Sequence, residues 1–179
     1  MRIISGLYKG RKLNRVNKST TRETADMVRE AVFQMIEISP SDIILDLFGG
    51  SGAYALEAIS RGAKFAYISD HDKDAVKTIY KNASALECQD KVEISLREDF
   101  KMLKKLEHIM IDKSFIDPPY LYQSYDKLLT LLSNQTSHNG LVIVETEKKT
   151  ILKDRYQDLI KIKEKIYGIK KISIYKKEQ

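Results

Sequence analysis

Hydrophobic positions along the chain follow two periods, that of helices and that of strands, and the two alternate. Near the N-terminus, apolar residues spaced three and four apart predict an amphipathic helix within 20–39. These residues are Val28, Ala31, Val32, Met35 and Ile36. Thr20 or Thr24 could cap this helix, and Thr20 with Glu23 has the spacing of a capping box.

Short apolar or alternating runs beyond this helix predict strands, and helical patterns lie between them. The strands are expected at 42–48, 64–70, 91–96, 140–146 and just before Asp117, and the helices at 53–62, 73–86, 100–106 and 125–134. Strands that alternate with helices predict an α/β fold with a doubly wound, mostly parallel sheet. Two alternating runs around Gly168, within 159–177, predict an antiparallel C-terminal hairpin at one edge of it.

The composition is that of one globular domain, with 179 residues, 42% hydrophobic and 31% charged. We expect a basic N-terminal arm or hairpin over 1–22, outside the sheet, and the α/β domain over 23–179. The single cysteine, Cys88, cannot form an internal disulfide, which favours a reducing compartment. No apolar run has the length of a signal peptide or a bilayer span, so a cytoplasmic location is expected.

Basic residues gather at the two ends of the chain, although the net charge is only +6. Residues 1–22 carry seven Lys or Arg and no acid, and residues 148–179 carry eleven against four acids. The stretch between them carries thirteen basic and twenty-one acidic groups. This asymmetry indicates a polyanion bound at the ends and separate chemistry in the middle. The alternative is a solubilising surface with a lysine-rich tail.

Three glycines, Gly49, Gly50 and Gly52, lie where a predicted strand passes into a predicted helix. Glycine lets a ligand approach the backbone, and Asp70, twenty residues after Gly50, could accept from both hydroxyl groups of a ribose. The glycine run matches the NAD fingerprint G-x-G-x-x-A. The acid Asp46 would repel a pyrophosphate and instead favours the ammonium group of S-adenosylmethionine. A third interpretation is that the glycines only allow close packing.

The run Asp117-Pro118-Pro119-Tyr120 follows an apolar pair that ends a predicted strand. Proline fixes φ and lacks an N–H, so the chain must leave the strand in a stiff, extended loop. Such a loop would hold Asp117 and Tyr120 in set directions. A strand-ending turn with a capping Asp explains the run equally well.

Four motifs, in order along the chain, resemble those of the RsmD family: DLFGGSGAYALEAISRGA, SDHD, REDF and FIDPPY. That family comprises bacterial enzymes that methylate the exocyclic N2 of a guanine in small-subunit ribosomal RNA. The resemblance extends over nearly the whole chain, from MRIISGLYKGRKL to YGIKKISIY. It implies a class I, Rossmann-like methyltransferase fold with S-adenosylmethionine as cofactor. The implied partner is ribosomal RNA or the small ribosomal subunit.

The resemblance implies a role for individual positions. The cofactor-binding residues would be Asp46, Phe48, Gly49, Gly50, Ser51 and Gly52 around the methionine end, Asp70 at the ribose and Asp99 at the adenine amino group. The residues facing the target base would be Asp117, Pro118, Pro119 and Tyr120, and those touching RNA would be Arg2, Lys9, Arg11, Lys12 and Arg22. The family usually has apolar residues where Lys113 and Ser114 stand, which predicts an exposed or frayed strand start.

A guanine amino group is a poor nucleophile, because its lone pair is delocalised into the ring. Asp117 could accept one N–H of that group and the carbonyl of Pro118 the other, which would stabilise the positive charge that develops. Tyr120 offers a ring on which the base could stack. The base must be unstacked to reach such a pocket, which is easiest in a loop.

Three other functions fit parts of the sequence. The D-P-P-Y run serves DNA methylation at adenine N6 or cytosine N4 equally well, although the chain leaves little room for a target-recognition domain. The glycine run leaves an NAD-dependent oxidoreductase open, and the basic ends leave an RNA-binding protein with an inactive site. The three histidines, His71, His108 and His138, are scattered, so no metal site is expected.

Overall fold

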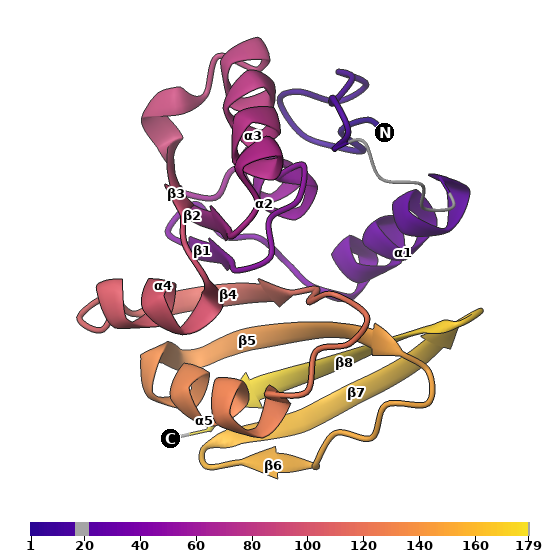
Figure 1. Ribbon diagram of the computed structural model, residues 1–179, viewed down its shortest axis with the longest axis vertical. Helices are drawn as coiled ribbons and strands as arrows, with labels where there is room; N and C mark the ends of the chain where they lie inside the picture. The colour runs from indigo at the N-terminus through magenta and orange to yellow at the C-terminus, as the bar shows by residue number, and fades with distance from the viewer. Residues whose placement is uncertain (17–21, 179) are drawn as a thin grey trace.

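The computed structural model describes residues 1–16 and 22–178, which form one eight-stranded sheet in the order β3-β2-β1-β4-β5-β8-β7-β6 (Figure 1). Strands β1 to β5 are parallel, and β8, β7 and β6 follow them antiparallel. The predicted doubly wound sheet with an antiparallel C-terminal edge is therefore confirmed. The strands are β1 (Ile43–Asp46), β2 (Phe65–Asp70), β3 (Val92–Leu96), β4 (Ile111–Ile116), β5 (Thr136–Glu147), β6 (Arg155–Tyr156), β7 (Leu159–Tyr167) and β8 (Lys170–Lys177).

Helices cover both faces of the sheet, because each strand sends alternate side chains to opposite sides. Ile44 joins the core under the first three helices, whereas its neighbour Leu45 joins the core under the last two. Ile143 and Val144 divide in the same way. The helices are α1 (Arg22–Met35), α2 (Ala53–Ser60) and α3 (Lys73–Ala85) on one face, α4 (Asp99–Lys105) and α5 (Tyr125–Gln135) on the other, and the short η1 (Gln89–Lys91) before β3.

Strand β4 corrects one expectation, since its first residue is buried and the next two are half-buried rather than exposed or frayed. The ammonium group of Lys113 lies 2.5 Å from Asp42, and both side chains are largely buried. Ser114 is fully buried. The ion pair neutralises the lysine in the low-dielectric interior, so a charged residue stands in a central strand with most of its side chain shielded from solvent.

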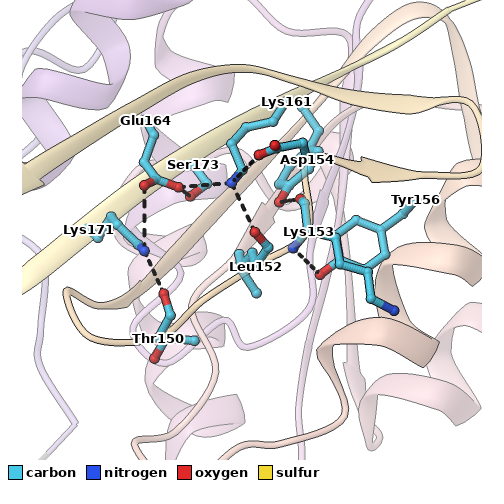
Figure 2. A network of polar contacts seen from close by, with 10 residues as sticks. Thr150, Leu152, Lys153, Asp154, Tyr156, Lys161, Glu164, Lys171 and Ser173 are labelled. Carbon is cyan, nitrogen blue, oxygen red and sulfur yellow. Dashed lines mark hydrogen bonds and ion pairs between the residues drawn. The ribbon is translucent and has the colours of Figure 1, made fainter.

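The C-terminal strands are tied to the preceding loop by a polar network (Figure 2). Glu164 on β7 lies between two lysines, 3.1 Å from Lys161 and 3.6 Å from Lys171. Lys161 also donates to the carbonyl of Leu152, and Lys171 to that of Thr150. Charge-assisted bonds of this kind hold the loop before β6 against β7 and β8. Strand β6 itself was not predicted, because two residues carry no readable period.

The N-terminal segment over residues 1–16 lies outside the sheet and packs beside α2 and α3. Arg2 and Lys12 form an isolated antiparallel bridge, and the side chains of Ile3 and Leu13 are buried in the core beneath it. The sulfur of Met1 lies 3.2 Å from the hydroxyl of Ser51, so the arm begins beside the glycine loop. We keep the division into an arm over 1–22 and a domain over 23–179 as a proposal. The predicted cap Thr20 lies outside the described residues.

Glu57 on α2 anchors this arm, and its replacement should release it. Its fully buried carboxylate accepts the N–H groups of Ile4 at 2.7 Å and Ser5 at 3.0 Å, and pairs with Arg61 at 2.9 Å. We expect Glu57→Ala to lower the free energy of unfolding by about 2 kcal/mol, measured by urea denaturation, since bonds to a charged group are lost. Trypsin should also cleave the arm faster. The exposed Glu30→Ala is the control, and equal stability of the two variants would contradict the anchoring role.

Candidate active site

Three aspartates meet at the carboxyl edge of the parallel strands. Asp46 ends β1, Asp70 ends β2, and Asp117 directly follows β4. Strand β1 lies between the other two, with Asp46 paired to Ile68 on one side and Phe115 on the other. In doubly wound sheets, ligands bind at this edge. The structure thus brings together residues that are up to 71 positions apart in the sequence.

Asp46 is a buried carboxyl group, and the hydrogen bonding described for it does little to offset the cost of burying its charge. Asp46 is 2% exposed. Among the described residues, the N–H of Ala55 donates a hydrogen bond to it, and this bond is long at 3.4 Å. Burial, with a smaller contribution from the nearby Asp70, raises the pKa of Asp46 to about 7. A positively charged group bound beside it would restore its ionised form.

In the glycine loop between β1 and α2, Gly49 is closely packed, whereas Gly50 borders open space. A Cβ at Gly49 would lie 2.6 Å from the side chain of Ile68, so that glycine permits close packing. Gly50 has a φ of 56° and a Cβ there would meet nothing within 4 Å, so its backbone borders free space. Its N–H donates to Asp70 at 2.9 Å, and the N–H of Asp72 donates to the other carboxylate oxygen at 2.9 Å. Two backbone groups therefore orient Asp70.

Asp99 begins α4 and is already engaged. One oxygen accepts the N–H of Phe100 at 2.8 Å, and the other accepts the hydroxyl of Tyr122 at 2.5 Å. The ring of Tyr122 packs edge-on against Phe48, with centroids 5.3 Å apart. A ligand amino group at Asp99 would share an oxygen with Tyr122. The residue proposed for the adenine is thereby linked to the loop that follows D-P-P-Y.

The D-P-P-Y loop places its acid and its ring in different surroundings. The side chain of Asp117 is 39% exposed, and the ring of Tyr120 is 67% exposed. The ammonium group of Lys149 lies 5.7 Å from the centroid of that ring. The carbonyl of Pro119 accepts the N–H of Tyr122 at 2.9 Å, which closes a turn. Tyr120 therefore presents ring surface that a base could cover.

Three side chains next to Asp117 had no signal in the sequence. Glu145 on β5 is buried and accepts the hydroxyl of Tyr54 at 3.0 Å. Lys170 on β8 lies 3.1 Å from Glu145 and 3.9 Å from Asp117. Burial and then repulsion from Glu145 raise the pKa of Asp117, while Lys170 opposes both. Because Asp117 keeps partial exposure, solvent limits this increase. A period-2 pattern shows which residues face the core, but not which acids and bases meet.

Four of the five basic residues expected to touch RNA divide into two groups. Arg2 donates to a carbonyl within the arm, and Arg11 to the carbonyl that ends α3, so both also hold the arm in place. Lys9 and Lys12 are exposed. Arg22 begins α1, but its side chain lies outside the part of the structure that is described.

Across residues 1–16 and 22–178, no helix is long and apolar enough to cross a membrane. In the same residues, no group of three or more histidine, cysteine or acidic side chains could hold a metal ion. Cys88 is buried, and burial raises the pKa of its thiol to about 11. This cysteine therefore packs as a small apolar side chain.

The residues at the carboxyl edge fit S-adenosylmethionine. Asp46 is a buried carboxyl whose hydrogen bond from Ala55 is long at 3.4 Å, so it suits the ammonium group of the methionine end. The backbone of Gly50 borders open space, and Asp70 is oriented at the next strand end. A pyrophosphate beside Asp46 would instead place two anions together in the interior. The fold and this edge define a class I S-adenosylmethionine-dependent methyltransferase.

The chain belongs to the family described as Conserved hypothetical protein 95, which matches residues 1–176. It is 35% identical over 182 residues to ribosomal RNA small subunit methyltransferase D of Haemophilus influenzae, covering 98% of this chain and 93% of that one. The resemblance to the RsmD family is thus confirmed, and the interpretation as an NAD-dependent oxidoreductase is not supported.

Solved structures agree with this placement. The yhhF protein of Escherichia coli superposes with a TM-score of 0.84 at 28% identity, over 99% of this chain and 98% of that one. An RNA methyltransferase from Salinibacter ruber, in complex with S-adenosyl-L-homocysteine, gives a TM-score of 0.68 at 18% identity over 90% and 95% of the two chains. At that identity, the second likeness shows the fold alone.

Proposed function

We propose that this protein transfers the methyl group of S-adenosylmethionine to the exocyclic N2 amino group of a guanine in small-subunit ribosomal RNA, in the cytoplasm. The observation that carries the proposal is the position of Asp117 and Pro118 at the strand edge that also holds Asp46 and Asp70. The name of the Haemophilus influenzae relative supports the class of substrate. The exposed ring of Tyr120 at the same loop supports a planar base as the acceptor.

The cofactor would be held by Asp46, the glycine loop and Asp70, and when bound it supplies a methyl group activated by a positively charged sulfur. Asp117 accepts one N–H of the target amino group, and the carbonyl of Pro118 accepts the other. These two acceptors aim the nitrogen lone pair away from themselves and stabilise positive charge on the nitrogen. Tyr120 stacks on the base, which must leave its own stack to reach the loop.

The proton balance involves Asp117. As the amino nitrogen forms its new bond to carbon, it becomes positively charged and must lose one proton. The carboxylate of Asp117, already hydrogen-bonded to that N–H, accepts the proton and later passes it to solvent. Because burial and Glu145 raise the pKa of Asp117, the carboxylate is a stronger proton acceptor than a free aspartate.

Methyl transfer from radiolabelled S-adenosylmethionine tests the proposal. The acceptors are small ribosomal subunits that lack the modification, free small-subunit RNA and genomic DNA, with the product nucleoside identified by mass spectrometry. We expect N2-methylguanosine from one or both ribosomal acceptors. Label in N6-methyladenine or N4-methylcytosine of DNA would establish the DNA alternative instead. RNA binding without transfer to any acceptor would indicate an inactive site.

The basic arm is expected to contribute to RNA affinity. Lys9 and Lys12 are exposed, and each phosphate contact that is lost should weaken binding and flatten its salt dependence. We expect Lys9→Gln with Lys12→Gln to reduce affinity for small-subunit RNA roughly ten-fold near physiological salt. The control is Lys64→Gln with Lys104→Gln, two exposed lysines outside the arm, one just before β2 and one on α4. Filter binding over a salt series measures both slopes, and identical slopes would limit the arm to a structural role.

A further inference from the structure

A lysine on the last strand lies between two acids at the proposed acceptor site. The ammonium group of Lys170 is 3.1 Å from one oxygen of Glu145 and 3.9 Å from Asp117. The other oxygen of Glu145 accepts the hydroxyl of Tyr54 at 3.0 Å. Lys170 begins β8 and pairs with Glu147, so it reaches the site from the antiparallel edge rather than from the parallel strands.

The groups that face Asp117 come from five elements, and two of them are carboxylates. They are Asp46 on β1, Tyr54 on α2, Tyr125 on α5, Glu145 on β5 and Lys170 on β8, while Glu147 on β5 acts on Tyr125 and Lys170. Of these groups, Lys170 alone carries a positive charge. Repulsion among the carboxylates would otherwise favour placing a proton on one of them. A protonated Asp117 would lose much of its ability to accept a hydrogen bond from the amino group.

We propose that Lys170 is a positioning residue for methyl transfer, whose ammonium group, anchored on Glu145, holds Asp117 in its ionised, hydrogen-bond-accepting form. This inference rests on the proposed function of Asp117. It adds a requirement that the D-P-P-Y run does not contain: a cation supplied from β8, more than fifty positions further along the chain.

The surroundings of Lys170 keep it in place. Glu145 is fixed by Tyr54, whose ring stacks on Phe115 with centroids 5.0 Å apart. The next residue, Lys171, belongs to the network around Glu164, which ties β8 to its neighbours (Figure 2). Lys170 therefore reaches Asp117 from a strand that these contacts hold in place. Its distance from the carboxylate suits control of charge better than a direct bond, since 3.9 Å exceeds hydrogen-bonding length.

The pKa directions agree with this arrangement. Burial, followed by Glu145, raises the pKa of Asp117, and Lys170 lowers it. Removing the lysine should therefore move the titration of Asp117 upward, and activity would be lost as the pH falls through that higher value. An opposite charge at this distance typically shifts a carboxyl by about one to three pH units. Partial exposure of both side chains places the expectation at the lower end of that range.

The experiment compares Lys170→Met, Lys170→Arg and Glu145→Gln with the wild type. Carbon-13 NMR of the labelled Asp117 carboxyl gives its titration without any substrate, and kcat over pH gives the acid limb of the reaction. We expect Lys170→Met to raise both midpoints by about one pH unit, and Lys170→Arg to restore most of the shift. Glu145→Gln should lower the midpoint, because it removes the repelling acid. Lys104→Met, an exposed lysine on α4, should change neither.

The outcomes separate the inference from the proposed function. Coincident titrations of Asp117 in wild type and Lys170→Met would overturn the role of Lys170, as would a change confined to the KM for RNA and its salt dependence. A shifted titration in a protein that methylates no RNA would instead overturn the proposed function. The NMR spectrum of Lys170→Met also reports whether that variant is folded, and Lys170→Arg tests the charge with the packing retained.

Discussion

Asp117→Ala is expected to lower kcat by on the order of 100-fold or more, while the Kd for S-adenosylmethionine changes little. The carboxylate lies at the edge shared with Asp46, but β1 separates it from Asp70, which is oriented for a ribose. Its loss removes a charged acceptor from the amino group at the moment that positive charge develops. Rapid-quench single-turnover kinetics measure the chemical step, and calorimetry measures cofactor binding.

Two further variants define what Asp117 contributes. Asp117→Asn keeps an acceptor oxygen but not the charge, so it should fall between wild type and alanine. Asp126→Ala, which removes an exposed carboxylate on α5, should leave kcat unchanged. In the wild type, the acid limb of kcat should lie above the ordinary range of an aspartate, since the pKa of Asp117 is raised and its ionised form is required. Turnover of Asp117→Ala near the wild-type rate would remove this residue from the mechanism.

The succession of strands and helices could be predicted because each element carries its own period in a local run of residues. The carboxyl ends of those strands share one edge in any doubly wound sheet, so the grouping of Asp46, Asp70 and Asp117 followed from element order alone. Features that depend on pairing between distant segments could not be predicted. Lys113 indicated exposure, and its partner Asp42 lies 71 positions away.

The same limit applies to the site. Glu145 and Lys170 meet Asp117 only because β5 pairs with β4 on one side and with β8 on the other. Nothing in the spacing of these residues indicates that register. The bond from Tyr122 to Asp99 joins the loop after D-P-P-Y to the first residue of α4, a contact that hydrophobic periodicity does not describe. Motifs thus predict which residues would contact ligands, whereas the neighbouring charges that shift the pKa of those residues depend on the assembled sheet.

Asp70→Ala is expected to show the reverse pattern, with the Kd for S-adenosylmethionine weakened by about 100-fold and kcat at saturating cofactor within a few-fold of wild type. Two hydrogen bonds from ribose hydroxyls to a charged acceptor, at a net worth of roughly 1.5 kcal/mol each, account for that factor. The carboxylate is already oriented by the N–H groups of Gly50 and Asp72, so little ordering is required when ribose binds.

Loss of Asp70 also removes the carboxylate that accepts those two N–H groups, which could disorder the glycine loop and imitate a direct contact. Asp70→Asn separates the two effects, because its amide oxygen can still accept one of the N–H groups but can no longer offer a charged acceptor to the ribose. If the ribose contact dominates, Asp70→Asn should bind the cofactor nearly as weakly as Asp70→Ala while its melting temperature stays near that of wild type. Asp74→Ala, an exposed acid on α3, is the control for calorimetry. An unchanged Kd in Asp70→Ala would show that the ribose binds elsewhere along the strand edge.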